Sequence, residues 1–217
     1  MSACNTLRLN AVRIALPGRV LIGTLDASVA PGECLTLMGP SGCGKSTLLN
    51  FLAGTLEPVF DASGQVRIGE VNATQLPPER RGFGILFQDD LLFPHLSVGG
   101  NLAFALPADV KPRAARQARI EAALAEAGLA GFANRDPATL SGGQRARVAL
   151  MRTLLAAPRA LLLDEPFNKL DAQLRDEIRD FVFRHARAFG LPTLMVTHDE
   201  ADARAAGGRI LQMGEAR

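Results

Sequence analysis

A glycine-rich octapeptide is the feature that most constrains the fold of this chain. Residues 39–46 read Gly-Pro-Ser-Gly-Cys-Gly-Lys-Ser and fit the pattern G-x-x-x-x-G-K-[ST]. The pattern binds phosphate where a strand enters it and a helix leaves it, because backbone N–H groups and the helix N-terminus then face the anion. Glu33–Met38 has the short apolar pattern of a buried strand, and Lys45–Ala53 has the pattern of a helix closed by Gly54. The sequence therefore predicts a phosphate-binding loop.

Each residue type in this loop has an expected contact. Lys45 is expected to contact the β- and γ-phosphates, Ser46 to give its hydroxyl to Mg²⁺, and Thr47 to reach the α-phosphate. The alternative, a glycine-rich turn that binds nothing, is disfavoured by the strand and the helix on either side. The predicted cradle consists of Gly39, Pro40, Ser41, Gly42, Cys43, Gly44, Lys45, Ser46 and Thr47.

A second apolar run ends in two carboxylates. Leu161–Leu163 is followed by Asp164 and Glu165, and the C-terminal ends of strands are where α/β sheets bind ligands. Asp164 is expected to hold the Mg²⁺ shell, and Glu165 to polarise a water for in-line attack on the γ-phosphate. A lone Asp-Glu pair is weak evidence, but downstream of a complete phosphate loop it is strong.

The order of the expected elements indicates an α/β fold. Strand and helix patterns alternate in the last quarter, which implies a parallel sheet covered on both faces. The middle is rich in the helix formers Ala, Leu, Arg and Glu, so we expect a helical insertion between about Asp89 and Ala157. Strands are predicted over 7–16, 19–29, 33–38, 65–71, 83–87, 160–163, 193–197 and 209–213, and helices over 45–53, 98–106, 112–127, 142–157, 172–189 and 200–206.

Composition narrows the class of protein. The 217 residues are 47% hydrophobic and 21% charged, which excludes wholesale disorder. The net charge of +2 is too small to drive non-specific nucleic-acid binding, so no nucleic-acid partner is expected. Cys4, Cys34 and Cys43 form no C-x-x-C pair, which favours a reducing compartment. No secretory leader or bilayer-spanning run is visible, so a cytoplasmic location is expected.

Leu140-Ser141-Gly142-Gly143-Gln144 distinguishes among phosphate-loop proteins. Ser141 is expected to cap a helix that continues to Ala157. Glycine is a poor helix residue, so Gly142 and Gly143 at this position favour close approach of the backbone to an anion. An ordinary flexible helix cap is the alternative.

With these motifs in order, the chain resembles the ATP-binding subunit of an ATP-binding cassette (ABC) transporter over nearly its whole length. The phosphate loop is followed by Gln88 in a Q-loop, the signature at 140–144, the strand ending in Glu165, Asp171 in a D-loop and His198 in an H-loop. Six motifs in register make a chance match negligible.

The resemblance implies one ABC ATPase domain over residues 1–217, with a P-loop NTPase (RecA-like) core, an antiparallel β subdomain and an inserted α-helical subdomain. Residues 1–88 and 158–217 would form the α/β core with the β subdomain. Residues 89–157 would form the helical subdomain that carries the signature.

The resemblance also implies ATP and Mg²⁺ as cofactors. Glu165 would be the base that orients the attacking water, His198 would contact the γ-phosphate and tie Glu165 to it, and Gln88 would join the Mg²⁺ shell. The implied nucleotide contacts outside the phosphate loop are Ser141, Gly142, Gly143, Gln144 and Asp171.

The sequences of Leu92–Val98 and of the phosphate loop resemble those of bacterial importer subunits. The chain is also similar to a small enterobacterial subunit of this class. This implies an ATP-hydrolysing motor for solute uptake, acting as a head-to-tail dimer of two copies around two MgATP. The implied partners are a transmembrane permease, which would hold the chain at the inner face of the cell membrane, and indirectly a periplasmic solute-binding protein.

Three other function classes also use a phosphate loop. An exporter ATPase keeps all the motifs and stays open as the alternative. A soluble ABC ATPase of DNA repair or translation would carry coiled coils, iron–sulfur cysteines or two cassettes. A small-molecule kinase would need neither the signature nor His198.

The chain departs from the family pattern at several positions. Leu16 stands where the family stacks adenine on an aromatic residue, so weaker base selectivity is expected. Lys169 stands in the D-loop where a small residue is more common, and both a solvated face and a subunit contact stay open. Apolar residues near the insertion fit a groove for the permease or core packing equally: Phe93, Leu96, Phe104 and Leu106.

Overall fold

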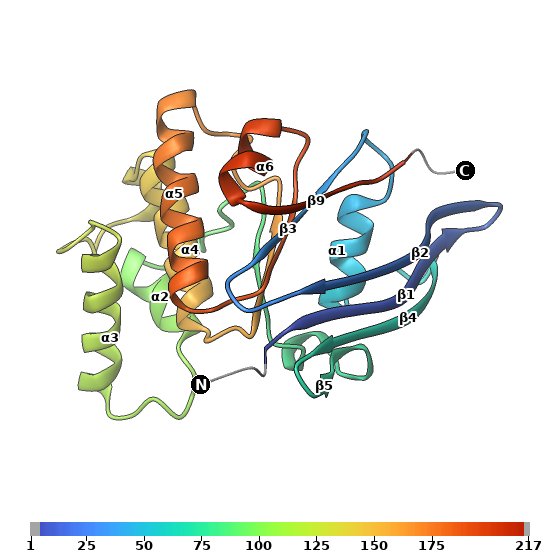
Figure 1. The fold of residues 1–217 in the computed structure, drawn as a ribbon. Coiled ribbons are helices and arrows are strands. Elements are labelled where there is room, and N and C mark those ends of the chain that lie inside the picture. The colour runs from blue at the N-terminus through green and yellow to red at the C-terminus, as the bar shows by residue number, and fades with distance from the viewer. Residues whose placement is uncertain (1–4, 215–217) are drawn as a thin grey trace. The chain divides into compact units, whose positions relative to one another are not determined.

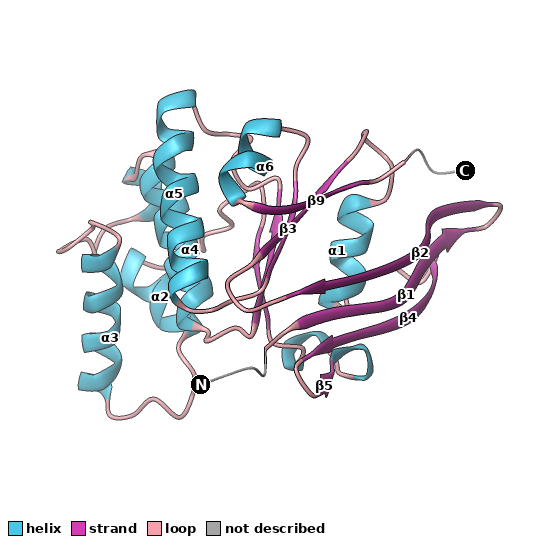
Figure 2. Ribbon diagram, in the orientation of Figure 1, coloured by secondary structure: helices cyan, strands magenta, loops and turns pink. Residues whose placement is uncertain are grey.

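The computed structural model describes residues 5–214, and its strands lie in two sheets (Figures 1 and 2). The antiparallel sheet has the order β2-β1-β4-β5, and the second sheet has the order β6-β7-β8-β3-β9. In the second sheet, β3 pairs in parallel with β8 and β9, and β7 pairs in parallel with β8. The strands are β1 (Leu7–Leu16), β2 (Arg19–Val29), β3 (Cys34–Met38), β4 (Asp61–Ile68), β5 (Val71–Asn72), β6 (Phe83–Leu86), β7 (Ala160–Asp164), β8 (Thr193–Val196) and β9 (Gly208–Gln212).

The helices agree with the predicted ones to within a few residues. None of the helices in the described residues is both long enough and apolar enough to cross a membrane. They are α1 (Lys45–Ala53), α2 (Val98–Ala105), α3 (Arg113–Glu126), α4 (Gly142–Leu155), α5 (Ala172–Ala188) and α6 (Glu200–Ala206), with short 3-10 turns at Ala73–Gln75, Pro78–Arg80 and Pro137–Thr139. The α/β fold with a parallel sheet and an antiparallel β part is therefore confirmed.

The chain divides into two compact units. The first contains the residues up to Ile85 together with 159–165 and those from Phe183 onward, and the second contains 86–158 and 166–182. The boundaries at 85/86 and 158/159 lie close to the predicted limits of the helical insertion. Residues 166–182 join the second unit.

In the first unit, α1 packs in the core that joins both sheets (Figure 1). All five residues of β3 are buried, as expected for an interior strand of a parallel sheet. Arg81 fixes the far end of α1, because its guanidinium donates to the carbonyl oxygens of Phe51 and Leu52 at 2.7 and 2.9 Å. The helix that begins at the phosphate loop is therefore held at its C-terminal end as well.

Both predicted ends of one strand are wrong. Strand β4 begins at Asp61, which pairs with Ala15 of β1, rather than at Gln65, and it ends at Ile68 rather than at Val71, which belongs to β5. The register between these strands shifts after Asn10, and a Cβ on Gly64 would lie 2.6 Å from a carbonyl oxygen of β1. A β-bulge therefore places polar and glycine residues in the sheet, and tertiary pairing outweighs their low strand propensity.

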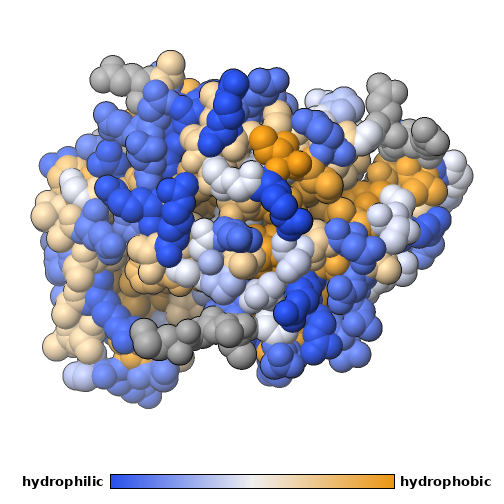
Figure 3. Space-filling view, in the orientation of Figure 1, coloured by the Kyte–Doolittle hydropathy of each residue, from blue (hydrophilic) through white to orange (hydrophobic). Residues whose placement is uncertain are grey.

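Strand β9 forms an edge of the parallel sheet. Its five residues are exposed, and Ile210 and Leu211 are among the large apolar side chains that reach the surface. Figure 3 shows the hydropathy of one face of the molecule, with apolar and polar residues interspersed. Of the cysteines, Cys34 and Cys43 are free and buried, whereas Cys4 lies outside the described residues.

Candidate nucleotide site

The phosphate loop connects the C-terminal end of β3 to α1. Gly42 and Gly44 have φ values of +78° and +95°, in the left-handed region that favours glycine, and Gly44 is the N-cap residue of α1. A Cβ on Gly39 would lie 2.6 Å from the carbonyl oxygen of Met213, so no side chain fits there. The two glycines of the pattern, Gly39 and Gly44, and the additional Gly42 are each favoured by the backbone geometry.

The Lys45 side chain is buried inside this loop. Its Nζ donates to the carbonyl oxygens of Gly39 and Pro40, both at 2.8 Å, and lies 3.8 Å from Sγ of Cys43. The loop therefore concentrates positive charge at its own centre, next to the N-terminus of α1. An anion placed there can replace the carbonyl oxygens as the partner of the ammonium group.

Ser46 and Asp164 meet although 118 residues separate them. The Ser46 hydroxyl donates to Oδ1 of Asp164 at 3.1 Å. Burial raises the pKa of Asp164 and the charge of Glu165 adds to this, while the hydrogen bond from Ser46 and the charge of Lys45 oppose it. The carboxylate is therefore incompletely balanced, which favours a cation beside it.

This donor set fits Mg²⁺. Hydroxyl and carboxylate oxygens are the hard ligands that Mg²⁺ prefers, and it is usually held by one or two carboxylates together with substrate phosphates. Within residues 5–214 there is no cluster of three or more His, Cys, Asp or Glu side chains that could hold a metal by itself. A cation at Ser46 and Asp164 would therefore depend on phosphate oxygens for the rest of its shell.

Glu165 and His198 face each other at the ends of neighbouring strands. Glu165 follows β7, His198 follows β8, and Nδ1 of His198 lies 3.3 Å from Oε1 of Glu165. The Glu165 backbone has φ +46°, and its N–H donates to the carbonyl oxygen of Val196 at 2.9 Å. A non-glycine residue in this conformation is uncommon, and such residues cluster at functional sites.

The signature opens α4 with a reciprocal cap. The backbone N–H of Ser141 donates to Oε1 of Gln144 at 3.0 Å, and the N–H of Gln144 donates to Oγ of Ser141 at 3.3 Å. Gly143 is buried, and a Cβ there would lie 2.3 Å from Cδ1 of Leu174. Around Gly142 the nearest atom to such a Cβ is 3.9 Å away. Gly143 is thus explained by helix packing, and Gly142 alone leaves open backbone.

The remaining candidates lie in the second unit or at the end of β1. Gln88 is exposed after β6 and lines a groove of about 440 Å³. Oδ1 of Asp171 accepts from the N–H of Leu174 at 3.0 Å and so caps α5. Leu16 is half-buried and pairs with Arg19 at the β1–β2 turn. The first unit brings together Lys45, Ser46, Asp164, Glu165 and His198, whereas Gln88, Ser141–Gln144 and Asp171 belong to the second.

Comparison with known proteins identifies the family. The model of the ABC transporter family matches residues 22–168, which is more than half of the chain. The chain belongs to the ABC transporter family. ATP-binding proteins of this family are ATPases, so this ABC protein binds and hydrolyses nucleotide. The match includes the phosphate loop and the signature. It ends before Asp171 and His198, so these two residues are candidates on the contacts described above.

Relatives of this ABC protein include import subunits. It is 50% identical over 204 residues to YnjD of Escherichia coli K12, an uncharacterized ABC transporter ATP-binding protein, covering 94% of this chain and 93% of YnjD. It is 42% identical over 203 residues to the putative 2-aminoethylphosphonate import ATP-binding protein PhnT of Salmonella typhimurium, covering 93% of this chain and 54% of PhnT. It is 42% identical over 198 residues to the sulfate/thiosulfate import ATP-binding protein CysA of Mycobacterium bovis, covering 91% and 56%. The chain thus spans about half the length of these two import proteins.

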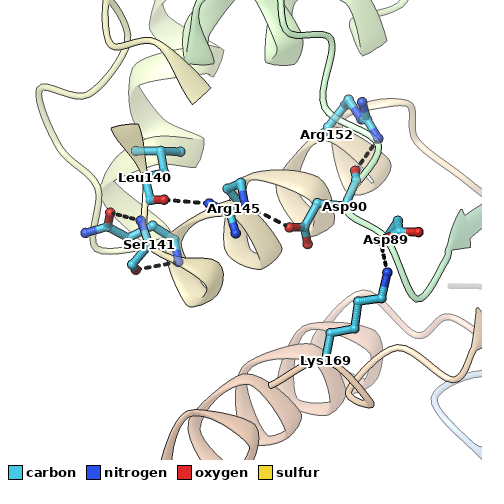
Figure 4. A network of polar contacts seen from close by, with 8 residues as sticks. Asp89, Asp90, Leu140, Ser141, Arg145, Arg152 and Lys169 are labelled. Carbon is cyan, nitrogen blue, oxygen red and sulfur yellow. Dashed lines mark hydrogen bonds and ion pairs between the residues drawn. The ribbon is translucent and has the colours of Figure 1, made fainter. Parts of the chain in front are cut away.

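Sequence reasoning missed the residues that hold the Q-loop of this ABC protein in place. Figure 4 shows Asp90 facing Arg145, and Lys169 reaching Asp89. Arg145 and Arg152 are seven positions apart on α4 and so share a helix face, a spacing that predicts a common acidic or carbonyl partner. The sequence alone does not identify Asp90 as that partner.

Proposed function

We propose that this chain is the ATP-hydrolysing motor subunit of a bacterial ABC importer, acting as a head-to-tail dimer around two MgATP. The observation that carries the proposal is the meeting of Ser46 with Asp164 and of Glu165 with His198 beside the phosphate loop. These contacts provide a cation site and a candidate base at one sheet edge. The import names of its relatives support uptake, and they do not favour an exporter.

The phosphate loop performs the binding step. Residues 39–47 would hold the phosphates through backbone N–H groups, with Lys45 turning from the carbonyls of Gly39 and Pro40 toward the β- and γ-phosphates. Ser46 and Asp164 would hold Mg²⁺. When bound, this ion neutralises charge on the phosphate oxygens. Leu16 would give the adenine aliphatic contact only.

Glu165 and His198 perform the hydrolytic step. Glu165 would orient a water and accept its proton at a carboxylate oxygen, while His198, whose Nδ1 lies 3.3 Å from Oε1, would hold the carboxylate in place. Positioning and charge neutralisation supply most of the rate in phosphoryl transfer. Ser141–Gln144 and Asp171 of the second copy would complete each site, and Gly142 is where open backbone supports close approach to phosphate.

A surface of the second unit supports docking of a permease at the inner face of the membrane. Phe104 is 70% exposed, and its ring meets the ring of Phe93 edge-on at 4.8 Å between centroids. Large exposed aromatic side chains are typical of interaction surfaces. Leu106 is buried and belongs to the core instead. A cytoplasmic location, the permease and a periplasmic solute-binding protein are parts of this proposal.

ATP hydrolysis by the purified chain tests the proposed function. The wild-type protein should hydrolyse MgATP, and Glu165→Gln should lower kcat by about 100-fold or more while it keeps ATP affinity, because only the proton acceptor is lost. Glu57→Gln, which changes an exposed carboxylate of a loop in the same unit, is the matched control and should keep the wild-type rate. Hydrolysis by Glu165→Gln at the wild-type rate would overturn the role of Glu165.

A further inference from the structure

An ion pair joins the Q-loop to the D-loop inside the second unit. We call residues 88–91 the Q-loop segment. Its Asp89 pairs with Nζ of Lys169, the residue two positions before Asp171, as Figure 4 shows. Lys169 therefore contacts its own chain, and about half of its side chain stays exposed.

The Q-loop segment is already attached to the signature helix α4. Oδ2 of Asp90 accepts from Nε of Arg145 at 3.3 Å, and Arg152 donates to the Asp90 carbonyl oxygen at 3.1 Å. Arg145 also donates at 2.7 Å to the carbonyl oxygen of Leu140, directly before the signature serine. Two arginines, one near the start and one in the last turn of α4, thus tie this segment to that helix. Lys169 links the D-loop to the same Q-loop segment.

The Lys169–Asp89 pair contributes little to folding. The two side chains are 54% and 63% exposed, and an exposed ion pair stabilises a protein only slightly. The pair lies instead between two loops whose neighbouring residues, Gln88 and Asp171, are candidates for the nucleotide site. Asp171 is fixed by its cap on α5, so the segment 169–171 is short and held at both ends.

We propose that Lys169 and Asp89 are positioning residues for ATP hydrolysis, holding the D-loop at a fixed place relative to the Q-loop segment. This inference rests on the proposed function. Without the pair, Gln88 and Asp171 sample more positions, so the reactive arrangement is populated less often and kcat falls. ATP affinity stays, because the phosphate loop that would bind the phosphates is built in the first unit.

The pair also lies in the wall of a groove of the second unit. Gln88, Asp89 and Lys169 all line this groove of about 440 Å³.

A charge-reversal cycle tests this role. Lys169→Ala, Asp89→Ala and the double variant Asp89→Lys/Lys169→Asp are compared with the wild type by kcat and KM for MgATP, over a series of NaCl concentrations. The matched control is Arg13→Asp/Asp61→Arg, which reverses an ion pair of 3.4 Å between similarly exposed side chains in the antiparallel sheet. Amide hydrogen exchange of residues 88–91 and 168–171 is measured on the same proteins without nucleotide.

We expect each single variant to lose about two- to five-fold in kcat with KM nearly unchanged, the range that an exposed ion pair can supply. The charge-reversed double variant should recover most of the rate, and the control should keep it. In about 1 M NaCl the difference between wild type and Lys169→Ala should shrink, because salt screens the pair. Exchange at 88–91 and 168–171 should quicken in Lys169→Ala and return in the double variant.

Equal kcat for Lys169→Ala and wild type, or a double variant slower than both single ones, would overturn the positioning role and leave the proposed function standing. A wild-type protein without ATPase activity would instead contradict the proposed function. In that case the hydrogen exchange still decides whether the pair holds the two loops, and unchanged exchange in Lys169→Ala would refute it.

Discussion

Burial disfavours the charged form of the Asp164 carboxyl group. Burial foremost raises its pKa in the folded protein above the usual value of 3.8. The folded state thus binds this proton more tightly than the unfolded state, and the stability this gives is fully present below the unfolded pKa. It is lost as the pH rises through the folded pKa. At neutral pH the carboxylate therefore destabilises the nucleotide-free protein.

Asp164→Asn should consequently stabilise the nucleotide-free protein at neutral pH while it removes Mg²⁺-dependent hydrolysis. We expect a small rise in Tm, because Asp164 is partly exposed and solvent screens its charge. The advantage should fade as the pH is lowered toward the unfolded pKa. Thermal melts of both proteins across this pH range check the prediction, and a lower Tm for Asp164→Asn at neutral pH without Mg²⁺ would contradict it.

The sequence predicted single residues well where a motif carried the geometry. The strand before Gly39 and the strand before Asp164 end at the same sheet edge, so the meeting of Ser46 with Asp164 follows from the α/β pattern. The left-handed backbone of Glu165 could not be predicted, because nothing in Leu-Leu-Asp-Glu-Pro signals a positive φ. The Lys169–Asp89 pair could not be predicted either, because 80 residues separate its members and no periodicity links them.

At the scale of elements, the contact between α4 and α5 gives the two signature glycines different tasks. Gly143 lets Leu174 pack against α4, whereas a methyl group at Gly142 meets open space. Sequence reasoning assigned both glycines to the approach of an anion. It could not separate them, because packing of α5 against α4 depends on a residue that lies far along the chain.

Alanine substitutions should separate these tasks. Gly143→Ala should lower stability by about 1–3 kcal/mol through overpacking, and adding Leu174→Ala should restore part of the loss. Gly142→Ala should leave Tm unchanged or slightly raised, because alanine favours a helix, yet should lose ATPase activity by blocking approach to phosphate. Melting curves and hydrolysis rates of the three variants are compared. A destabilised Gly142→Ala, or a fully stable Gly143→Ala, would contradict this assignment.

Elements were predicted more accurately than their pairing. Hydrophobic periodicity gave the strands and helices of the α/β core almost residue by residue, since their burial follows from the pattern itself. The predicted start of β4 is wrong because pairing with β1, rather than local propensity, places Asp61 in the sheet. The contacts among the Q-loop segment, α4 and Lys169 arise at the same tertiary level.

At the scale of the whole molecule, each copy of the chain carries the residues proposed for both halves of a nucleotide site. The first unit contains the phosphate loop, Ser46, Asp164, Glu165 and His198, and the second contains the signature and the D-loop. A head-to-tail dimer would place the signature of one copy over the phosphate loop of the other. The dimer would form with bound MgATP and separate after hydrolysis, so a variant that cannot hydrolyse should accumulate it.

The mass and nucleotide content of Glu165→Gln test this account most directly. Size-exclusion chromatography with light scattering should give the monomer mass of 23.0 kDa without nucleotide. With MgATP the mass should double, and two unhydrolysed ATP molecules should remain per dimer. Adding Lys45→Ala should abolish the dimer, because the phosphates are no longer neutralised in the loop. A Glu165→Gln protein that binds MgATP and stays at 23.0 kDa would contradict the proposed motor.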